Sequence, residues 1–350
     1  MILRNNIDCG IRNKEGNAML KTGKLENDVL KKIVIDKITY KRPEVLTRAG
    51  VGEDCAVVDF GEFECVMSTD PITAAVSEIG RLAIHISCND IASNGIEPVG
   101  IMLAVLLPVG TTEEDVEMIM GQAAETAAAC SVEIIGGHTE VTAAVNQPVI
   151  VSTAIGKGKK WQSASAENIR VGDVILMTKQ AGLEGTGIIA SDFRQELLEF
   201  LQPEEIEEAA GLLDRVSVVR DGVVAGQVGT HGMHDVTEGG ILGAVWEMCR
   251  VGGVGCEVME DKIPVSDVTR KICSHYGINV LRLISSGAML IVAEPEKQRK
   301  IEEKLAACGI EVSQIGKILP PEAGLMTISP DGTRSPIQPP AADELYKVVK

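Results

Sequence analysis

The chain has 350 residues, which is long for one domain and sufficient for two, and hydrophobic residues make up 45% of it. Aromatic residues account for only 3%, so the core has to be built from aliphatic side chains. A formal net charge of −17 without a basic stripe argues against nucleic-acid binding. The longest apolar stretch, residues 99–109, is about half as long as a membrane-spanning helix. The first residues lack the apolar core of a signal peptide, and we expect a cytoplasmic protein that does not enter a membrane.

The first half of the chain alternates between helical and extended patterns. A β-hairpin is predicted from two short apolar runs, residues 55–58 and 64–68, with Gly61 in the turn between them. Thr111 and Glu114 resemble a capping box that begins a helix reaching about Cys130. The other predicted elements are helices near 25–40 and 77–94 and strands at 99–107, 132–135 and 147–155.

The second half begins after a segment rich in glycine, lysine and serine, which is the best candidate for a domain boundary. Its predicted strands cover residues 173–178, 254–258, 288–293, 311–318 and 324–328. Helices are predicted at 183–201, 204–212, 214–226, 240–250, 265–276 and 295–308, with a glycine-rich turn at 229–240. Strands and helices are mixed in both halves, so we predict two α/β domains with mixed sheets. The expected division is an extension (1–26), an N-terminal domain (27–158), a linker (159–169), a C-terminal domain (170–332) and a tail (333–350).

Two aspartates flank the predicted hairpin, and they form the first candidate site. Asp54 begins one strand and Asp70 ends the other, so an antiparallel pairing brings the two side chains together at one edge. Like charges at that distance share a cation or a proton, and carboxylate oxygens suit Mg²⁺. The alternative interpretation is two solvated loop aspartates. A second polar pair, Asn89 and Asp90, interrupts the apolar part of the helix predicted at 77–94 and needs a partner there.

Glycine-rich segments that follow predicted strands are candidate phosphate sites, because glycine lets backbone N–H groups approach an anion. Gly136 and Gly137 precede His138, and no Gly-Lys-Ser/Thr of a Walker A loop follows them. A simple turn is the alternative for the glycines, and a turn hydrogen bond is the alternative for His138.

Two further segments of the second half are treated in the same way. Asp235 and Thr237 precede Gly239 at the start of a helix, where they either cap the helix or leave its N–H groups to an anion. Lys179 ends a strand beside a glycine-rich turn and either reaches a phosphate or is simply exposed. The nine cysteines contain no CxxC pair, so reduced and mostly buried thiols are expected rather than a zinc or iron–sulfur site.

Five short motifs occur in order along the chain. They are Gly-Glu-Asp-Cys-Ala-Val from residue 52, Ser-Thr-Asp from 68, Asn-Asp-Ile-Ala-Ser-Asn-Gly from 89, Gly-Gly-His-Thr from 136 and Asp-Val-Thr-Glu-Gly-Gly from 235. This order resembles the AIR-synthase-like superfamily, which includes aminoimidazole ribonucleotide synthase, thiamine-monophosphate kinase, selenide water dikinase and HypE. The resemblance runs from about residue 27 to residue 330.

The resemblance implies a fold, a dimer and an ATP site. The N-terminal domain would pair with its copy to form a shared β-barrel, and the C-terminal domain would be an α/β sandwich. ATP and Mg²⁺ would lie between the domains, and an oxygen of the substrate would be activated by phosphoryl transfer. The implied Mg²⁺ ligands are Asp54, Asp70, Asp90 and Asp235. The implied catalytic residues are Asp70, Asp90, His138 and Asp235. The implied nucleotide-binding residues are Asp54, Thr69, Asn89, Gly136, Gly137, Thr139, Lys179, Thr237 and Gly239.

Within the superfamily, the motifs at 136–140, 233–240, 285–287 and 315–316 are most similar to HypE, the hydrogenase-maturation branch. That branch implies a small or protein-carried substrate and a HypF-type partner. Members of the branch end in Pro-Arg-Ile-Cys, whereas this chain ends in residues 343–350 without cysteine, and its last cysteine is Cys308. The segment 178–187 is more similar to the kinase and synthase branches. A thiamine-monophosphate-kinase-like enzyme and a catalytically silent nucleotide-binding scaffold are therefore the alternatives, although kinases of that type tend to carry an aspartate at position 138.

Overall fold

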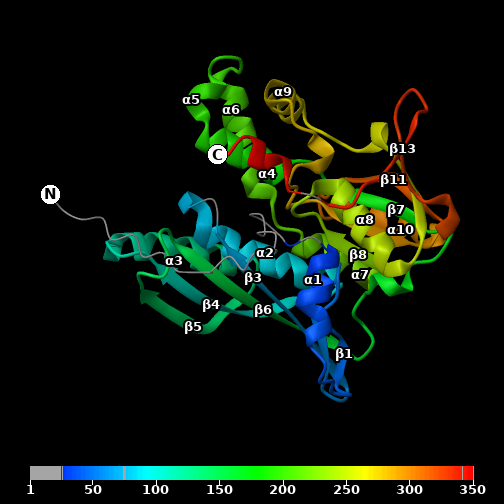
Figure 1. The fold of residues 1–350 in the computed structure, drawn as a ribbon, viewed down its shortest axis with the longest axis horizontal. Coiled ribbons are helices and arrows are strands. Elements are labelled where there is room, and N and C mark those ends of the chain that lie inside the picture. Colours follow the sequence, from blue (N-terminus) through cyan, green and yellow to red (C-terminus); the bar gives the residue numbers. More distant parts are fainter. Residues whose placement is uncertain (1–24, 26, 74–75, 341, 350) are drawn as a thin grey trace, which may run out of the picture.

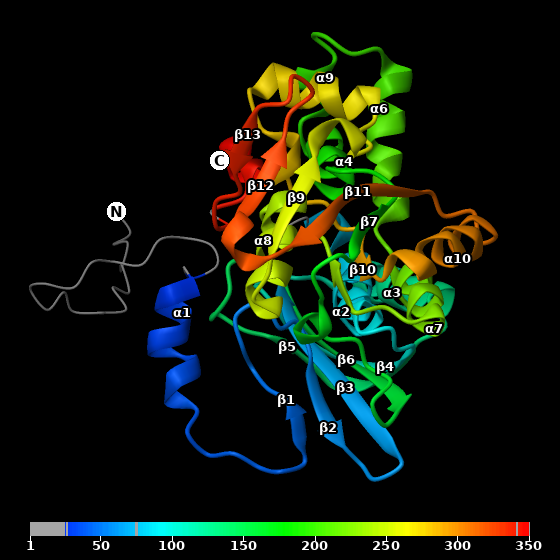
Figure 2. The same ribbon diagram turned by 90° about the vertical axis from the view of Figure 1, so that its right-hand side faces the viewer.

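The computed structural model describes residues 25, 27–73, 76–340 and 342–349. They form two mixed β-sheets with helices packed against them, one sheet from each half of the chain (Figures 1 and 2). The predicted α/β class with two such units is therefore confirmed. The predicted extension, residues 1–26, lies outside the described residues apart from Leu25.

The first sheet has six strands in the order β1-β2-β3-β6-β4-β5, and only β4 and β5 are parallel neighbours. Its strands are β1 (Val45–Thr47), β2 (Ala56–Asp59), β3 (Phe63–Ile72), β4 (Pro98–Leu107), β5 (Glu133–Val141) and β6 (Val149–Lys159). Helices α2 (Ile79–Ser93) and α3 (Glu113–Ala129) pack together on one face of it (Figure 1). The short helix α1 (Asn27–Ile33) has no buried residue and stands beside the sheet (Figure 2).

The predicted hairpin is confirmed, because β2 and β3 pair antiparallel with Ala56 opposite Met67. Gly61 lies in the turn with a φ of +84°, a conformation that glycine adopts without strain. The capping box of α3 is one residue later than predicted. The hydroxyl of Thr112 accepts from the Asp115 N–H, and the Asp115 carboxylate accepts from the Thr112 N–H.

The second sheet has seven strands in the order β13-β12-β9-β11-β7-β10-β8, with β9 and β12 as its parallel pair. The strands are β7 (Val174–Thr178), β8 (Gly232–Asp235), β9 (Gly255–Met259), β10 (Met289–Ala293), β11 (Val312–Leu319), β12 (Leu325–Ile328) and β13 (Arg334–Pro336). The helices are α4 (Leu183–Asp192), α5 (Arg194–Leu197), α6 (Pro203–Ala210), α7 (Val219–Val228), α8 (Gly240–Gly252), α9 (Asp267–Tyr276) and α10 (Pro295–Ala306).

Both faces of the second sheet are covered, which explains why β7 and β10 are buried throughout. On β7, Ile175 and Met177 face a core that includes α8, whereas Val174 and Leu176 face a core shared with α7 and α10. The expectation of aliphatic cores is confirmed, because these clusters consist largely of Val, Ile, Leu, Met and Ala.

Two glycine-rich segments that we predicted as turns contain strands. β5 continues through Gly136 and Gly137, and a Cβ added to Gly137 would lie 1.9 Å from the carbonyl oxygen of Leu103 on β4. Gly137 is therefore required for the close approach of two strands rather than for chain reversal. The segment 229–240 contains β8, which pairs with β10 along its whole length.

Helix α2 joins the two halves, and nearly all of its residues are buried. On one side it packs on β3 and β6, and on the other it contacts α7 and β8. A Cβ added to Gly222 of α7 would lie 2.0 Å from the carbonyl oxygen of Ala92, and one added to Gly226 would lie 2.6 Å from the Cα of Gly95. The two halves therefore meet with their backbones in direct contact.

The eight cysteines within the described part of the chain are free thiols, as expected. None of the described helices combines the length and the apolar character that crossing a membrane requires.

Candidate functional site

The candidate site lies where α2, the start of the β2–β3 hairpin and the end of β8 come together. Asp90 is near the end of α2 and is 4% exposed, because that helix is enclosed by both halves of the chain. Its carboxylate accepts a hydrogen bond from the Ser68 hydroxyl on β3 at 2.5 Å. The Cys55 thiol donates to the Asp90 carbonyl oxygen at 3.2 Å, which ties the hairpin to the same helix.

Asp235 contributes a second buried carboxylate from the other half of the chain. It is the last residue of β8, lies opposite Met289 of β10 and is 1% exposed. Neither of its carboxylate oxygens has a hydrogen-bond partner among the described residues. A buried carboxylate without donors is costly unless a cation is bound beside it.

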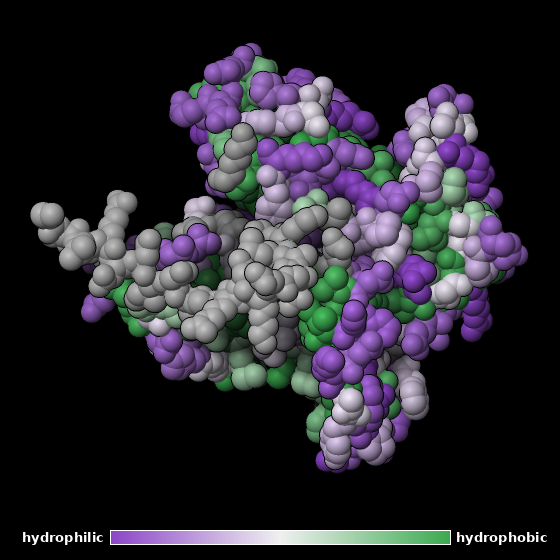
Figure 3. All heavy atoms as spheres, in the orientation of Figure 1, coloured by the Kyte–Doolittle hydropathy of each residue, from purple (hydrophilic) through white to green (hydrophobic). Residues whose placement is uncertain are grey.

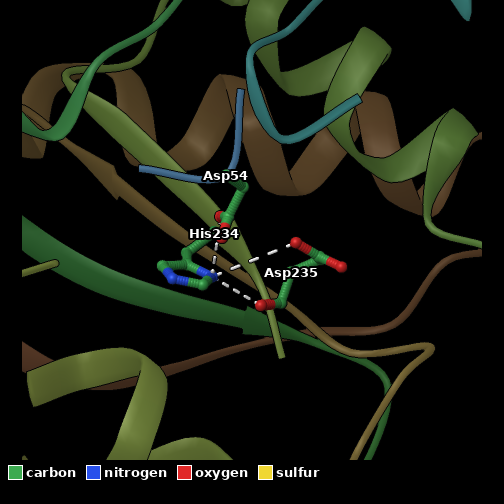
Figure 4. Close-up of side chains that lie close together, drawn as sticks. All are labelled: Asp54, His234 and Asp235. Carbon is green, nitrogen blue, oxygen red and sulfur yellow. Dashed lines mark hydrogen bonds and ion pairs between the residues drawn. The ribbon is translucent and has the colours of Figure 1, made fainter. Parts of the chain in front are cut away.

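His234 lies between the carboxylates (Figure 4). Its Nδ1 is 2.6 Å from the backbone carbonyl oxygen of Asp235 and 3.5 Å from Oδ2 of Asp54. Since a carbonyl oxygen can only accept, Nδ1 carries a hydrogen in this contact. On the other side of the ring, Nε2 is 3.4 Å from a carboxylate oxygen of Glu247 on α8. The imidazole therefore has acceptors on both sides, with hydrogen-bond geometry at Nδ1 and an ion-pair distance without that geometry at Nε2.

The charges of the site depend on one another. Burial alone lowers the pKa of the His234 imidazole, but the carboxylates of Asp54 and Glu247 outweigh that effect and the pKa rises to about 10. Burial raises the pKa of Asp235 to about 7, with the Asp54 carboxylate as the next cause. His234 is thus a cation that compensates part of the negative charge around it.

Asp90 belongs to the same electrostatic cluster. Burial raises the pKa of its carboxyl well above the ordinary value, and neighbouring carboxylates raise it further. In decreasing order of effect, these carboxylates belong to Asp235, Asp54 and Asp70. The structure therefore brings together the four aspartates that were selected from separate sequence motifs.

A cation fits this arrangement. A carboxylate oxygen of Asp54 and one of Asp235 lie within 4.8 Å of each other and of a ring nitrogen of His234. The two oxygens are the ligand atoms, because the protonated His234 ring acts as a counter-charge and not as a metal ligand. The Asp235 oxygens are buried and lack hydrogen-bond donors, and oxygen-rich sites of this kind suit Mg²⁺. The residues present are therefore compatible with the Mg²⁺ that the resemblance implies.

The residues predicted around Gly136 lie elsewhere. Gly136, Gly137, His138 and Thr139 are on β5, the edge strand, which is three strand spacings or about 14 Å from β3. The side chain of His138 is 66% exposed, and its Nε2 lies 3.2 Å from the Glu140 carboxylate. Within a single chain, these residues are separate from the aspartate cluster.

Lys179 is neither exposed nor directed at an open anion site. Its ammonium group donates to the Asp221 carboxylate at 2.8 Å and to the carbonyl oxygens of Ser217 and Gly287 at 2.8 and 2.9 Å. Asp221 is itself buried. The three donors of Lys179 therefore fasten β7 to the start of α7 and to the 285–287 loop.

The remaining predicted residues contact the protein itself. The Thr69 hydroxyl lies 2.9 Å from that of Thr153 across the β3–β6 pair. Asn89 is fully buried and faces the second half of the chain. The Thr237 carbonyl oxygen accepts from the Gly240 N–H, and the Gly239 N–H donates to the Asp343 carboxylate at 2.7 Å.

Sequence reasoning missed His234 and Glu247 as members of the site. The only sequence signal for His234 is its position beside Asp235 in the quoted motif. Glu247 lies within the otherwise apolar run of α8, where a charged residue needs a partner. Glu53 was also missed, and burial raises the pKa of its carboxyl to about 7, with the Asp54 carboxylate as the next cause.

Two α/β units with an acidic, cation-compatible cluster at their junction define the class of this protein as a two-domain α/β protein. The N-terminal domain of AIR synthase-related proteins matches residues 52–157, and the C-terminal domain of the same family matches residues 170–326. The chain therefore belongs to the AIR synthase-related family.

Among curated relatives, a putative hydrogenase expression/formation protein of Methanocaldococcus jannaschii is 28% identical over 81% of this chain and 84% of its own length. The carbamoyl dehydratase HypE of Escherichia coli K12 is 27% identical over 80% of this chain and 81% of its own. The closeness to HypE that the motifs indicated is thus confirmed at the level of sequence similarity.

Solved structures support the same fold. A crystal structure of a HypE–HypF complex matches with a TM-score of 0.74 and 22% identity, covering 89% of this chain and 99% of that one. HypE in complex with ATP matches with a TM-score of 0.67 and 21% identity, over 93% and 97% of the two chains. A ThiL protein complexed with AMPPCP and TMP matches with a TM-score of 0.70 and 18% identity, over 90% and 94%.

Proposed function

We propose that this chain is an ATP-dependent, Mg²⁺-requiring enzyme of the HypE type, with its nucleotide between the two halves. The observation that carries the proposal is the Asp235 carboxylate, which is 1% exposed and accepts no hydrogen bond from the described residues. Its cationic neighbour, His234 Nδ1, is 4.0 Å away and also faces Asp54, so several carboxylates share one positive charge. Burying such a carboxylate costs desolvation free energy, which a cation bound beside it during function would offset. The ATP-bound structure of HypE, a protein of the same fold, is consistent with this assignment.

In this proposal Asp54, Asp70, Asp90 and Asp235 would hold Mg²⁺, and the ion would supply positive charge that offsets the charge of the transferred phosphoryl group. His234 offsets part of the carboxylate charge and holds Asp54 in place. Ser68 orients the Asp90 carboxylate through its hydroxyl. Catalysis of this kind rests on positioning and on fixed charges rather than on covalent chemistry by the protein.

The proposed reaction activates a carbonyl or acceptor oxygen of a small or protein-carried substrate by phosphoryl transfer. A thiamine-monophosphate-kinase-like reaction is the second candidate, because a ThiL protein bound to AMPPCP and TMP has the same fold. Turnover with thiamine monophosphate separates the two candidates.

Isothermal titration of ATP with and without Mg²⁺, together with an assay of ADP release, tests the proposal. We expect magnesium-dependent binding in the wild type and its loss in Asp70→Asn and Asp235→Asn. The exposed His138→Gln variant reports whether the β5 residues take part. Binding without any turnover across acceptors would favour the silent scaffold, and no binding in either condition would refute the proposal.

A HypF-type partner is proposed on the basis of the solved HypE–HypF complex. Co-elution of this chain with a purified HypF-type protein, stable at moderate salt, is the expected result. Failure to associate at micromolar concentrations would remove the partner from the proposal.

A homodimer through the β4–β5 edge of the first sheet is proposed as well. Its exposed apolar side chains include Met102 at 41% and Ile135 at 51%, and an uncovered strand edge is prone to pairing. In sedimentation, Ile135→Lys is expected to be monomeric. Val109→Lys is the control, because Val109 is 73% exposed and lies in the turn after β4. A monomeric wild type would contradict the dimer.

A further inference from the structure

The segment after β13 folds back over the second half of the chain. The Ile337 N–H donates to the Leu325 carbonyl oxygen at 2.8 Å, and the Arg282 guanidinium donates to the Gln338 carbonyl oxygen at 2.8 Å. Figure 1 shows this segment in red beside α4. Near its end, Leu345 and Val348 are each 8% exposed and belong to the apolar cluster of α4, α6 and α9. We call residues 337–340 and 342–349 the strap.

Asp343 is the polar centre of the strap and is 3% exposed. One carboxylate oxygen accepts from the Gly239 N–H at 2.7 Å, and the other accepts from the N–H groups of Ile284 and Leu345 at 3.1 and 2.9 Å. A carboxylate that accepts several backbone hydrogen bonds is held strongly. Asp343 thereby joins the strap, the turn before α8 and the loop before β10.

The turn that Asp343 contacts, residues 236–239, directly follows Asp235, the candidate cation ligand. Gly239 is four residues after Asp235 and directly precedes α8. The neighbouring Glu238 accepts from the Tyr346 hydroxyl at 2.9 Å. A Cβ added to Gly239 would lie 3.2 Å from the Cβ of Pro340. The strap therefore grips two consecutive residues of this turn and also packs on it.

The strap also supplies the anion at the N-terminus of α8, namely the Asp343 carboxylate. The free N–H groups and the dipole at a helix N-terminus favour an anion, and the sequence suggested a phosphate there. In the structure that position already receives a carboxylate from the chain itself. The Gly239 N–H is consequently used for internal structure.

We propose that Asp343 is a positioning residue, through which the strap fixes the 236–239 turn and thereby sets the place of Asp235 in the carboxylate cluster. The inference rests on the proposed function only in that it takes Asp235 as a cation ligand. In this chain the residues after β13 are a built-in part of the site.

The variants Asp343→Ala and Asp343→Asn test this inference. Alanine removes all three hydrogen bonds, whereas asparagine keeps one acceptor oxygen and turns its NH₂ toward an N–H group. The matched control is Glu344→Gln, because the Glu344 side chain accepts from the Asn279 N–H at 3.0 Å and does not bind the turn. If Asp343→Ala fails to fold, Asp343→Asn and Tyr346→Phe carry the same test.

Amide hydrogen exchange is the first readout, and it needs no ligand. We expect exchange in residues 236–243 to accelerate about tenfold or more in both Asp343 variants and to stay unchanged in Glu344→Gln. The second readout is a double-mutant cycle in melting temperature. The rise in melting temperature caused by Asp235→Asn should be roughly halved in the Asp343→Ala background. In that background the turn is no longer fixed, so the Asp235 carboxylate is already less confined in its buried position.

The third readout is the affinity for Mn²⁺-ATP, which should weaken about fivefold or more in the Asp343 variants. Unchanged exchange in 236–243, or additive melting temperatures, would overturn the positioning role even if nucleotide binds normally. If the wild type binds no Mn²⁺-ATP, the proposed function fails, whereas the exchange and the cycle still decide the role of Asp343.

Discussion

The side-chain amide of Asn89 on α2 donates a hydrogen bond to the carbonyl oxygen of Val216, in the other half of the chain, at 2.8 Å. The amide oxygen of the same side chain accepts from the Val218 N–H at 2.8 Å. One buried side chain therefore satisfies two backbone groups across the junction of the halves. Because Asn89 precedes Asp90, this contact also fixes the helix that carries a candidate ligand.

Asn89→Ala should lower the free energy of unfolding by about 2–4 kcal/mol, since it leaves a buried carbonyl and a buried N–H without partners. Urea denaturation measures the loss. Asn94→Ala is the control, because Asn94 makes a longer bond of 3.3 Å to the Asp90 carbonyl oxygen at the end of the same helix. Equal losses in the two variants would show that the contact between the halves carries no special weight.

Asp235→Asn should raise the melting temperature of the metal-free protein and abolish Mg²⁺-dependent ATP binding. The stability gain at pH 8, about 1–3 kcal/mol, arises because the amide removes a buried charge that has no donor. Calorimetry and titration on the same sample test both parts. Asp331→Asn, at an exposed turn position, should change neither. A destabilised Asp235→Asn protein would mean that this carboxylate is satisfied in the free protein.

His234→Gln should destabilise the metal-free protein by about 1–3 kcal/mol, because the carboxylates of Asp54 and Asp235, 3.5 and 4.0 Å from Nδ1, lose their compensating charge. Added Mg²⁺ should then stabilise the variant more than the wild type, since a divalent cation can replace the missing positive charge. Thermal unfolding at several Mg²⁺ concentrations measures the difference. Equal responses to Mg²⁺ would separate His234 from the cation site.

Glu184→Gln should stabilise the protein at pH 8 and have little effect at pH 4. Glu184 is buried in the first turn of α4, and burial raises the pKa of its carboxyl from 4.5 to about 7. Between those values the unfolded chain releases a proton that the folded chain keeps, so folded-state stability falls as pH rises. We expect a gain of about 1–3 kcal/mol at pH 8.

Urea unfolding at the two pH values tests this dependence. The control is Glu114→Gln, at an exposed first-turn position of α3. The same gain at both pH values would indicate a packing effect of the amide rather than relief of a buried charge.

The sequence predicted the two α/β units from its alternating patterns, and the order of its motifs indicated four aspartates that the structure places in one electrostatic cluster. Their role as a cation site stays a prediction. The sequence could not assign Gly137 or Gly232, since glycine marks both turns and close strand packing. Only the contact with Leu103 distinguishes the two for Gly137. The partners of Lys179 are 38 to 108 residues away in the chain, so no local pattern could reveal that its charge is already used.

The capping box shows a different limit. Thr111 with Glu114 and Thr112 with Asp115 both satisfy the spacing, and local sequence cannot choose between overlapping matches. The backbone geometry at Thr112 decides it. His234 was missed for a similar reason, since its role depends on Asp54 and Glu247, which the fold brings from distant segments.

The close contact between Gly222 of α7 and Ala92 of α2 limits how far the two halves can move apart. Where Gly222 meets the backbone at Ala92, there is no side chain that could change rotamer to let the halves rotate apart. Closely packed backbones slide little past one another, so a wide hinge motion of the two halves would break the entire contact between α7 and α2. Under the proposed function, ATP would therefore have to enter through movement of the surface turns around the junction. Scattering curves of the free and nucleotide-bound protein should accordingly be nearly superimposable.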